Sequence, residues 1–503
     1  MIFADPSWIV LPVMGPLLAG ILCFLVRRGA VLISLAALVL NSLAVIVLFR
    51  RFILYGPVSY SIGGWSAPLG ISLRADGPSL LMLAMTAATG LGITFYARGY
   101  FAFRVDAHYR IDRHERQERF FWPLWMILLS GLNALFLSND IFNLYVTLEL
   151  IGVSAAALTA LSGKPASQIA SLRYLLVSLL GSLSYLLGVV FIYKTYAVLD
   201  LGLLTEMASD EPGVRAALAL MSVGLLLKTA LFPFHFWLPP AHANALAPVS
   251  AILSGLVVKG TFFMMFRLWF DVFAPVMPVS AYNLIGALGA AAILWGAVQA
   301  MRQQRLKLLV AYSTVSQLGY LFIAFPLAFQ NGGDQAWRAV IFMAVGHAFA
   351  KAAMFMASGT ILLHTGHDRV ADLAGIRSYL PVTVFAYAIA GVNLMGLPPS
   401  GGFTAKWMML TAALSSMQWW WALVLMAGSL LAAAYVFRVV SQLFIIPPDQ
   451  TAGQRHASAG LLEWPALALA VCSLFMGLIA PYPLYIIKMN QAAGVVLSMG
   501  GAP

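Results

Sequence analysis

Three lysines stand inside long apolar stretches of the sequence, where a charged side chain is costly. Lys228 precedes a proline break by five residues, Lys259 lies near the middle of the next apolar run, and Lys406 follows the interrupted stretch GLPPSGGF. A lysine at the centre of a membrane helix costs roughly 2.5–3.5 kcal/mol on insertion scales. Burial can lower the pKa of a lysine by several units, whereas an arginine stays charged. The three lysines therefore predict a charge-transfer path inside a membrane.

One acid and one histidine accompany these lysines. We expect Glu149, in the run NLYVTLELIGV, to pair with Lys228, so that movement of the acid changes how firmly the lysine holds its proton. The alternative is a fixed ion pair that only packs two helices. His347 and Lys351 are four residues apart and share a helix face, and a histidine can pass a proton through either ring nitrogen. The predicted proton relay is Glu149, Lys228, Lys259, His347, Lys351 and Lys406.

Four further residues are auxiliary candidates. His235 and His242 flank the first proline break and either shuttle protons or hydrogen-bond loose backbone. Tyr312 and Ser316 belong to the polar run in LVAYSTVSQLGY, which either hydrates the path or binds neighbouring helices. The sequence has no metal-ligand cluster, phosphate-binding glycine loop or nucleophile–base arrangement at a plausible spacing. We therefore expect no metal, no cofactor and no catalytic chemistry in this chain.

The composition predicts a membrane protein. Of 503 residues, 61% are hydrophobic and 9% are charged, whereas about a quarter are charged in a soluble domain. A net charge of +11 is then better explained by basic cytoplasmic loops than by nucleic-acid binding. Cys23 and Cys472 stand far apart in apolar runs and indicate neither a disulfide nor a metal site.

Apolar windows of about 20 residues predict an all-α polytopic fold with about fourteen transmembrane helices. The spans near 213–236 and 381–412 contain prolines and are expected to be broken helices, which membranes tolerate only beside protein or a water-filled cavity. The approximate cores are 8–26, 30–50, 77–97, 121–138, 141–161, 170–194, 213–236, 248–270, 282–301, 306–327, 337–363, 381–412, 417–444 and 462–482.

Two segments of five spans each carry a matching set of features. Spans four to eight hold an acid, a lysine before a break and a mid-helix lysine, and spans nine to thirteen hold the histidine–lysine pair, a break and a lysine. Five spans separate the two broken helices, so the breaks cross in opposite directions, as in an inverted repeat. A lysine that merely binds carbonyls freed at a break is less expected when both halves repeat it. The predicted domains are peripheral helices at 1–117, inverted five-helix repeats at 118–272 and 278–446, and a last helix with a short tail at 447–503.

Basic loops predict the orientation in the membrane. The arginine-rich loop 98–119 falls on the same side as most other loop cations, such as those following spans one and nine, and an acidic loop at 200–211 falls on the opposite side. The first side is then cytoplasmic, and both termini lie on the outer side of the cell inner (plasma) membrane. Lys307 is counted among the cytoplasmic loop cations, and the exceptions to the bias are Arg50, Arg51 and Arg74. Three arginines near span ends are expected to snorkel to the surface, namely Arg173, Arg267 and Arg438.

The run KTALFPFHFWLPPAHANALAPVSAILSGLVVK resembles the signature of the proton-conducting antiporter-like membrane subunits. That family includes complex I antiporter-like subunits, Mrp sodium/proton antiporter large subunits and relatives in membrane-bound hydrogenases. The family's eleventh span resembles GHAFAKAAMFMASG, and its twelfth resembles GLPPSGGFTAKW. The resemblance covers roughly residues 65–445. The D-type Mrp antiporter protein is the member most similar to the runs GGWSAPLGISLRADGPSLLML and NLYVTLEL. The resemblance implies fourteen helices with two inverted repeats, and it assigns the family's relay positions to Glu149, Lys228, Lys259, His347 and Lys406.

The sequence departs from the family pattern at several positions. Arg305 stands where an acid is usual, Leu308 replaces a second basic residue, and Arg173 stands where a lysine is common. The tail after residue 482 is short, which argues against the complex I member with a long lateral helix.

The resemblance implies a proton-translocating subunit of a multisubunit Na+/proton antiporter, with other membrane subunits as partners. The alternative is the pumping subunit of a redox complex, either NADH-quinone oxidoreductase-like or a membrane-bound hydrogenase, with its redox centres on other chains. An autonomous permease for a small solute is a third class, which the lysine series disfavours. The sequence leaves the coupled ion open.

Overall fold

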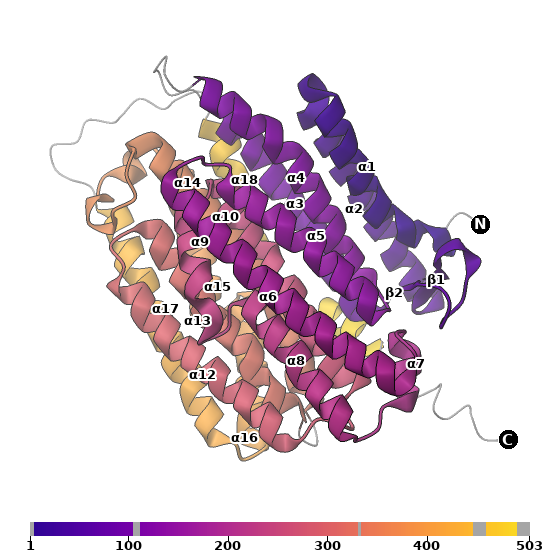
Figure 1. Ribbon diagram of the computed structural model, residues 1–503. Helices are drawn as coiled ribbons and strands as arrows, with labels where there is room; N and C mark the ends of the chain where they lie inside the picture. Colours follow the sequence, from indigo (N-terminus) through magenta and orange to yellow (C-terminus); the bar gives the residue numbers. More distant parts are fainter. Residues whose placement is uncertain (1–4, 104–110, 330–332, 446–458, 490–503) are drawn as a thin grey trace.

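The computed structural model describes residues 5–103, 111–329, 333–445 and 459–489, and this part of the chain is almost entirely helical (Figure 1). Within it, 13 helical segments are long and apolar enough to cross a membrane. The predicted twelfth span is the exception, because it consists of two shorter helices, α15 (Pro381–Met395) and α16 (Gly401–Ser415). The predicted all-α polytopic fold is confirmed.

The N-terminal part contributes three spans and a small hairpin that the sequence did not predict. The helices are α1 (Leu11–Leu25), extended at its start by a 3-10 turn, α2 (Ala30–Tyr55) and α3 (Gly77–Ala102), and strands β1 (Val58–Ser61) and β2 (Ser72–Ala75) pair antiparallel between α2 and α3. Only 33% of the apolar window of α1 is buried within the protein, against 72% for α3. The first two helices are thus peripheral, whereas α3 packs against α14 and α18.

The first broken helix lies in the middle of the chain. The preceding helices are α4 (Ile111–Leu137), α5 (Ile141–Ala160), α6 (Pro165–Tyr196) and the short, unpredicted α7 (Leu201–Met207). Helix α8 (Pro212–Thr229) then ends at Ala230, whose φ of 58° is left-handed, and α9 (Leu238–Asn244) resumes the span. The eighth span is continuous but contains two π-helical turns, in the order α10 (Ala247–Ile252), a π-turn (Leu253–Val257), α11 (Val258–Phe266) and a second π-turn (Arg267–Val272).

The second half of the chain repeats this packing. Helices α12 (Val279–Arg302), α13 (Leu306–Phe329) and α14 (Asp334–Thr365) precede the α15/α16 break, and α17 (Trp419–Phe444) and α18 (Ala459–Leu478) follow it. Helix α13 packs on α14 as α5 packs on α6, and α14 packs on α15 and α16 as α6 packs on α8 and α9. The two breaks are therefore equivalent elements of two related halves, although the exact domain boundaries stay a prediction.

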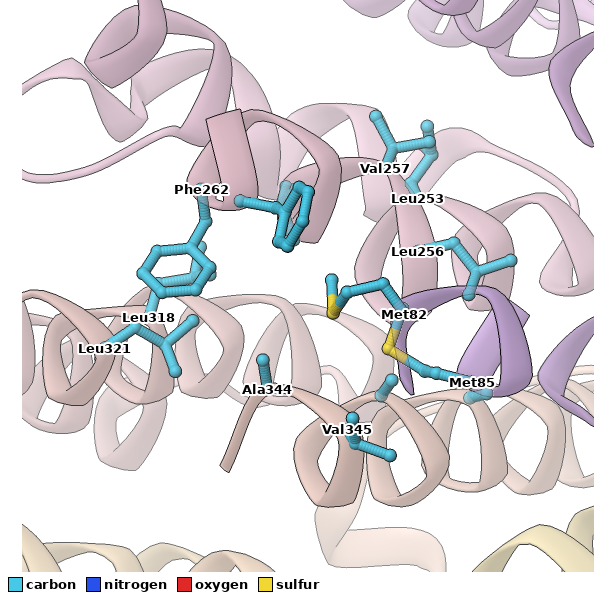
Figure 2. Packing of buried hydrophobic residues seen from close by; sticks show 14 of the residues in the cluster. Met82, Met85, Leu253, Leu256, Val257, Phe262, Leu318, Leu321, Ala344 and Val345 are labelled. Carbon is cyan, nitrogen blue, oxygen red and sulfur yellow. The ribbon is translucent and has the colours of Figure 1, made fainter. Parts of the chain in front are cut away.

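Apolar side chains fill most of the centre of the molecule. Figure 2 shows Met82 and Met85 of α3 facing Leu256 of the eighth span and Val345 of α14, with Leu318 of α13 nearby. The apolar windows of the eighth span and of α14 are completely buried. Since apolar side chains fill this centre, polar groups inside the bundle are confined to the specific positions described below.

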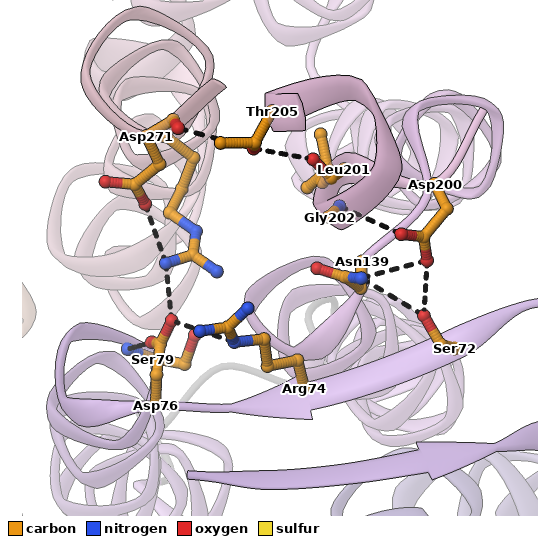
Figure 3. Close-up of polar contacts among 11 residues, drawn as sticks. Ser72, Arg74, Asp76, Ser79, Asn139, Asp200, Leu201, Gly202, Thr205 and Asp271 are labelled. Atoms are coloured by element: carbon orange, nitrogen blue, oxygen red, sulfur yellow. Dashed lines mark hydrogen bonds and ion pairs between the residues drawn. The ribbon is translucent and has the colours of Figure 1, made fainter. Parts of the chain in front are cut away.

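A network of polar side chains ties the hairpin to neighbouring helices at one end of the bundle (Figure 3). Asp200, before α7, accepts hydrogen bonds from the Asn139 side chain at 2.9 Å and from the Ser72 hydroxyl at 2.7 Å. Arg267 in the last π-turn lies 2.5 Å from Asp76 and 2.8 Å from Asp271. The prediction that Arg267 snorkels outward is therefore wrong, because two carboxylates hold it inside.

The predicted arginine-rich loop 98–119 is shorter than expected. Helix α3 continues to Ala102 and α4 begins at Ile111, so Arg98 belongs to α3 and Arg116 and Arg119 belong to α4. Arg104 and Arg110 lie outside the described residues. The basic character of this end of the bundle is thus carried largely by helix ends.

Candidate functional site

Lys228 and Glu149 form the ion pair that the sequence predicts. Lys228 lies in the last turn of α8, and its Nζ is 3.7 Å from Oε1 of Glu149 on α5. The same Nζ donates to the Ser178 hydroxyl at 3.0 Å and to the Leu148 carbonyl at 3.2 Å. The lysine side chain is 4% exposed and the glutamate side chain 26%, so the acid retains access to its surroundings while the lysine does not.

Small residues make room for Lys228 between α6 and α8. A Cβ added at Gly181 would lie 3.1 Å from Cγ of Lys228 and 2.8 Å from the Gly224 carbonyl oxygen. A larger residue at this position would push the two helices apart. The close approach of α6 to α8 therefore keeps the lysine near Ser178.

Lys259 is completely buried in the eighth span, where its Nζ donates to the Ser254 carbonyl. Ser254 belongs to the first π-turn, a distortion that leaves carbonyl groups available to side chains. The Ser254 hydroxyl is in turn 2.9 Å from the Thr314 hydroxyl on α13. Between the first two lysines, the hydroxyl of Thr229, next to Lys228, donates to the hydroxyl of Thr261 at 2.9 Å.

Lys351 and His347 lie on α14, and Lys351 shares the Val310 carbonyl with the Thr314 hydroxyl. The Lys351 Nζ donates to the Val310 carbonyl at 3.0 Å and to the Ser313 hydroxyl, both on α13. His347 is 1% exposed, and neither of its ring nitrogens has a hydrogen-bond partner among the described residues. It lies within electrostatic reach of Lys259, Lys351 and Lys406. An unpartnered imidazole among three lysines has both nitrogens free to exchange a proton with water.

Lys406 lies on the second half of the broken twelfth span and reaches back to the end of the first half. Its Nζ is 2.7 Å from the Leu394 carbonyl oxygen and 4.2 Å from the centroid of the Tyr320 ring. Gln317 on α13 donates to the same carbonyl at 3.3 Å. The break supplies this carbonyl because α15 ends at Gly396, whose φ of 78° favours glycine and whose missing Cβ would lie 2.8 Å from Cδ of Lys406.

The auxiliary candidates separate into two groups. His242 is completely buried, stacks on Phe355 with ring centroids 4.7 Å apart, and has no hydrogen-bond partner on either nitrogen within the described part of the chain. His235 is partly exposed and stacks on Phe232, and Ser316 donates to a carbonyl of α12 at 3.0 Å. Tyr312 is also partly exposed. Of these four residues, His242 is the one that lies among the relay lysines, within electrostatic reach of Lys259, Lys351 and Lys307.

Sequence reasoning missed Lys307, and it did not distinguish which residues of the polar run on α13 face the lysines. Lys307 was predicted to be a loop cation, but it is 2% exposed and donates to the Ala245 carbonyl, just after α9, at 2.6 Å. Ser313 and Gln317 are four residues apart, so they share one face of α13, whereas Ser316 faces α12. Helical spacing from Lys307 would have indicated this face, but the polar run alone did not say which hydroxyls face the lysines.

The arrangement is a buried series of amino groups joined by neutral oxygen atoms. Among the described residues, Glu149 is the one carboxylate within ion-pair distance of any of the four lysines Lys228, Lys259, Lys351 and Lys406. The described residues also contain no group of His, Cys, Asp and Glu that could hold a metal ion. Such an arrangement is suited to moving a charge in steps.

The fold and the site together define a polytopic membrane protein with a line of buried lysines through two related halves. A family model described as NADH:quinone oxidoreductase/Mrp antiporter, TM, matches residues 138–432, and the chain belongs to this family. The predicted family resemblance is confirmed.

Relatives of both functional kinds are similar to the chain. It is 32% identical to the N subunit of NADH-quinone oxidoreductase from Desulforudis audaxviator, over 88% of this chain and 87% of the relative. It is 25% identical to the D-type protein of the Na(+)/H(+) antiporter from Bacillus subtilis, over 98% and 97% of the two chains. Among solved structures, it matches a chain of the Mrp complex from Dietzia sp. DQ12-45-1b with a TM-score of 0.85 and 25% identity. It also matches a chain of an archaeal membrane-bound sulfane sulfur reductase with a TM-score of 0.86 and 25% identity. Each match covers 97% of both chains.

Proposed function

We propose that this chain is the proton-translocating membrane subunit of a multisubunit Na+/proton antiporter complex in the cell inner membrane, with both termini on the outer side. The observation that carries the proposal is the set of buried lysines in both halves, with hydroxyl contacts between the helices that carry them. The similarity along nearly the whole chain to a D-type antiporter protein and to a chain of an Mrp complex supports the antiporter assignment.

The proposed path starts at Lys228 in the first half. Thr229 and Thr261 connect the neighbourhoods of Lys228 and Lys259 across α8 and α11. From Lys259, the Ser254 carbonyl and the Ser254–Thr314 hydroxyl contact lead to the face of α13 that binds Lys351. Each hydroxyl can accept one hydrogen bond and donate another, whereas the carbonyl oxygens only accept, so in this proposal water carries the proton past the carbonyls.

The second half continues the path to the outer surface. His347 lies between Lys351 and the broken twelfth span, and Gln317 shares the Leu394 carbonyl with Lys406. In the predicted orientation Lys406 lies in the outer half of its span and acts as the exit. Gaps longer than a hydrogen bond are bridged by water in this proposal.

The switch in this proposal is the Glu149–Lys228 pair. At 3.7 Å the acid stabilises the protonated lysine, and withdrawal of the acid would leave a buried ammonium held only by a hydroxyl and a carbonyl. In this proposal the glutamate side chain, which is partly exposed, moves, and the enclosed lysine stays in place. Coupled transport then depends on the position of Glu149.

Entry from the cytoplasmic side is proposed to pass His242 and Lys307. The Lys307 amino group binds the carbonyl that follows α9, and His242 lies on α9 itself. Both residues belong to the predicted inner ends of their spans, and both are buried. In this proposal they give Lys259 and Lys351 a second connection to the inner surface, beside the route that starts at Lys228.

A second candidate is the pumping subunit of a redox-driven complex, which the 32% identity to the N subunit of a quinone oxidoreductase favours. The two candidates share the path and differ in their partners. Purification of the intact complex separates them, because iron–sulfur proteins accompany the redox subunit and only membrane partners accompany the antiporter subunit.

The test of the path is proton flux in vesicles that contain the whole complex. Lys351→Met removes a central amino group and should reduce flux about a hundredfold, as loss of a proton-transfer group does in enzymes. Lys194→Met is the matched control, since Lys194 is an exposed lysine at the end of α6. Wild-type flux in the Lys351→Met complex would refute the proposed path.

A further inference from the structure

A groove of about 550 Å³ lies between α1, α4 and α5, away from the lysine path. Its lining is apolar and includes Ile21 and Phe24 of α1, Phe120 and Ile127 of α4, and Ala157 and Leu161 of α5. Because α1 is a peripheral helix, with Ile21 50% and Phe24 60% exposed, the groove opens toward the surrounding membrane.

The shape of the groove follows from small residues on its walls. A Cβ added at Gly20 would lie 2.9 Å from the Ile127 side chain and 3.2 Å from the Pro123 carbonyl oxygen, so α1 and α4 approach closely at Gly20. Helix α5 contributes Ala157 and Ala160, whose short side chains leave the space beside them open. The groove therefore has a closed floor and an open side.

One end of the groove has a basic rim. Arg27 and Arg28 follow the lining residue Leu25, Arg119 precedes Phe120, and Lys164 comes three residues after Leu161. Because each cation adjoins a lining position in the sequence, all of them gather where α1 and α5 end and α4 enters the membrane. The exposed cations of this rim are Arg27, Arg28, Arg116, Arg119 and Lys164.

Two carboxylates reduce the charge of the rim without cancelling it. Glu115 and Glu118 lie on the same end of α4, and Glu118 accepts a hydrogen bond from the Trp122 indole at 3.4 Å. Five cations against these two carboxylates leave a net positive rim on the described side chains.

We infer that this groove binds a membrane phospholipid with an anionic headgroup, with an acyl chain between α1, α4 and α5 and the headgroup on the basic rim. The apolar lining offers nothing to a polar ligand, and the rim offers phosphate the guanidinium groups that bind it best. Basic pockets between transmembrane helices on the cytoplasmic side recognise anionic headgroups, and the rim lies on the predicted cytoplasmic side. This inference does not depend on the proposed transport function, since it concerns neither the lysines nor Glu149.

Native mass spectrometry of the purified full-length chain, titrated with phosphatidylglycerol or with phosphatidylcholine, tests the inference. The wild type should bind one phosphatidylglycerol more tightly than phosphatidylcholine. The rim variant Arg27→Ser/Arg28→Ser/Arg119→Ser should lose about a hundredfold in phosphatidylglycerol affinity, since each basic side chain near an anionic surface contributes a factor of about five.

A second variant and a matched control separate the groove from general surface charge. Ala157→Phe/Ala160→Phe fills the groove, keeps the rim and should abolish tight binding of either lipid. Arg302→Ser/Arg369→Ser/Arg377→Ser removes three exposed cations from the same predicted membrane side and should leave the affinity unchanged. Thermal unfolding shows which variants fold. If the triple rim variant does not fold, the single variants Arg28→Ser and Arg119→Ser are measured in its place.

Three results would overturn the inference. The first is equal affinity of the wild type for the two lipids. The second is an equal loss of affinity for phosphatidylglycerol in the rim variant and in its control. The third is a Phe24→Cys chain that cross-links to another membrane protein in the intact complex, because the groove would then hold a partner helix and not a lipid.

Discussion

Two groups of buried charges in this protein are built in opposite ways. At the end of the eighth span, Arg267 binds the carboxylates of Asp76 and Asp271, and Asp76 is also 3.8 Å from Arg74 (Figure 3). In the lysine path, Lys228 has one carboxylate at 3.7 Å, and Lys259, Lys351 and Lys406 donate hydrogen bonds only to neutral oxygen atoms of the described residues. The first group pairs every charge, and the second leaves most of its amino groups without a counter-ion.

The difference separates a fixed charge from a mobile one. Arginine keeps its proton, and Nη1 of Arg267 contacts both Asp76 and Asp271, so the cluster holds the hairpin end of α3 against the eighth span. A lysine can exist in either protonation state, and neutral oxygens can bind the amine as well as the ammonium. We therefore interpret the arginine cluster as structural and the lysine series as the conducting element, and each prediction below tests one side of this contrast.

The largest effect is expected for Glu149→Ala, which removes the single carboxylate of the lysine series. Coupled transport by the reconstituted complex should fall about a hundredfold, the range for loss of a proton-transfer group, while assembly is retained. Glu206→Ala, at an exposed acid of α7, is the control. Wild-type transport by an assembled Glu149→Ala complex would show that the pair is only a packing contact.

Lys406→Arg keeps the charge but exchanges a mobile proton for a fixed one. We expect proton flux to fall about tenfold or more, because arginine does not release its proton in the physiological range. Lys406→Glu keeps a titratable group and should retain part of the flux. If Lys406→Arg conducts as fast as the wild type, Lys406 is a structural lysine and the exit lies elsewhere.

Arg267→Lys tests the opposite side of the contrast. One terminal nitrogen of Arg267, Nη1, contacts both carboxylates, and the shorter lysine side chain should not reach both of them. The folding free energy should therefore fall by about 1.5–3 kcal/mol, the value of a hydrogen bond to a charged group. Flux per folded complex should not change. Arg215→Lys breaks an exposed pair with Asp210 and should be nearly neutral in thermal unfolding. Loss of flux without loss of stability would place Arg267 in the path.

The stability of the protein at low pH depends on the Arg267 cluster through Asp76, which precedes α3. Burial raises the pKa of this carboxyl, but Arg267 and Arg74 outweigh burial and hold its pKa below the ordinary 3.8. The stabilisation is therefore complete above 3.8 and is lost as the pH falls through the lower folded value. Asp76→Asn should lower the unfolding midpoint near neutral pH and flatten its decline below about pH 4. If the unfolding midpoint of Asp76→Asn depends on pH as in the wild type, the Asp76 carboxylate does not contribute to acid stability.

Sidedness decides which end of the lysine series receives protons, and its test should not alter activity. In a chain with Cys472→Ser, a cysteine placed at Arg116 on α4 should resist an impermeant thiol reagent added to intact cells. A cysteine at Glu206 on α7 should react readily. The reverse pattern would invert the predicted orientation and the direction of the path.

The sequence predicts the spans, both breaks and the lysines because these depend on local composition. Long apolar windows, prolines and isolated lysines are visible without knowledge of any neighbour. The Glu149–Lys228 pair was also predictable, since a lone acid at membrane depth has to find a cation. The roles assigned to these residues stay predictions.

Contacts between distant residues could not be predicted in this way. Arg267 meets Asp76 across 191 positions of the chain, so its place near a span end gave no sign of burial. Lys307 is buried because its amino group reaches the carbonyl after α9, which depends on how α13 packs against α9. Similarly, only the packing of α12 on α13 decides that Ser316 faces away from the lysines while Gln317 faces them.

The π-turn at Leu253–Val257 makes the chemistry of the eighth span sensitive to chain length. A π-turn holds one residue more than the α-helical turn it replaces, and successive α-helical residues are about 100° apart around the axis. Deleting Gly255 would convert the turn to regular helix with Lys259 at nearly its present angle, and it would place Lys259 four residues after Ser254, so that the Ser254 carbonyl accepts from the helix backbone and is lost to the lysine side chain. A one-residue deletion that preserves every lysine, every apolar window and the length of the span within a residue would therefore still remove the oxygen that binds the Lys259 amino group.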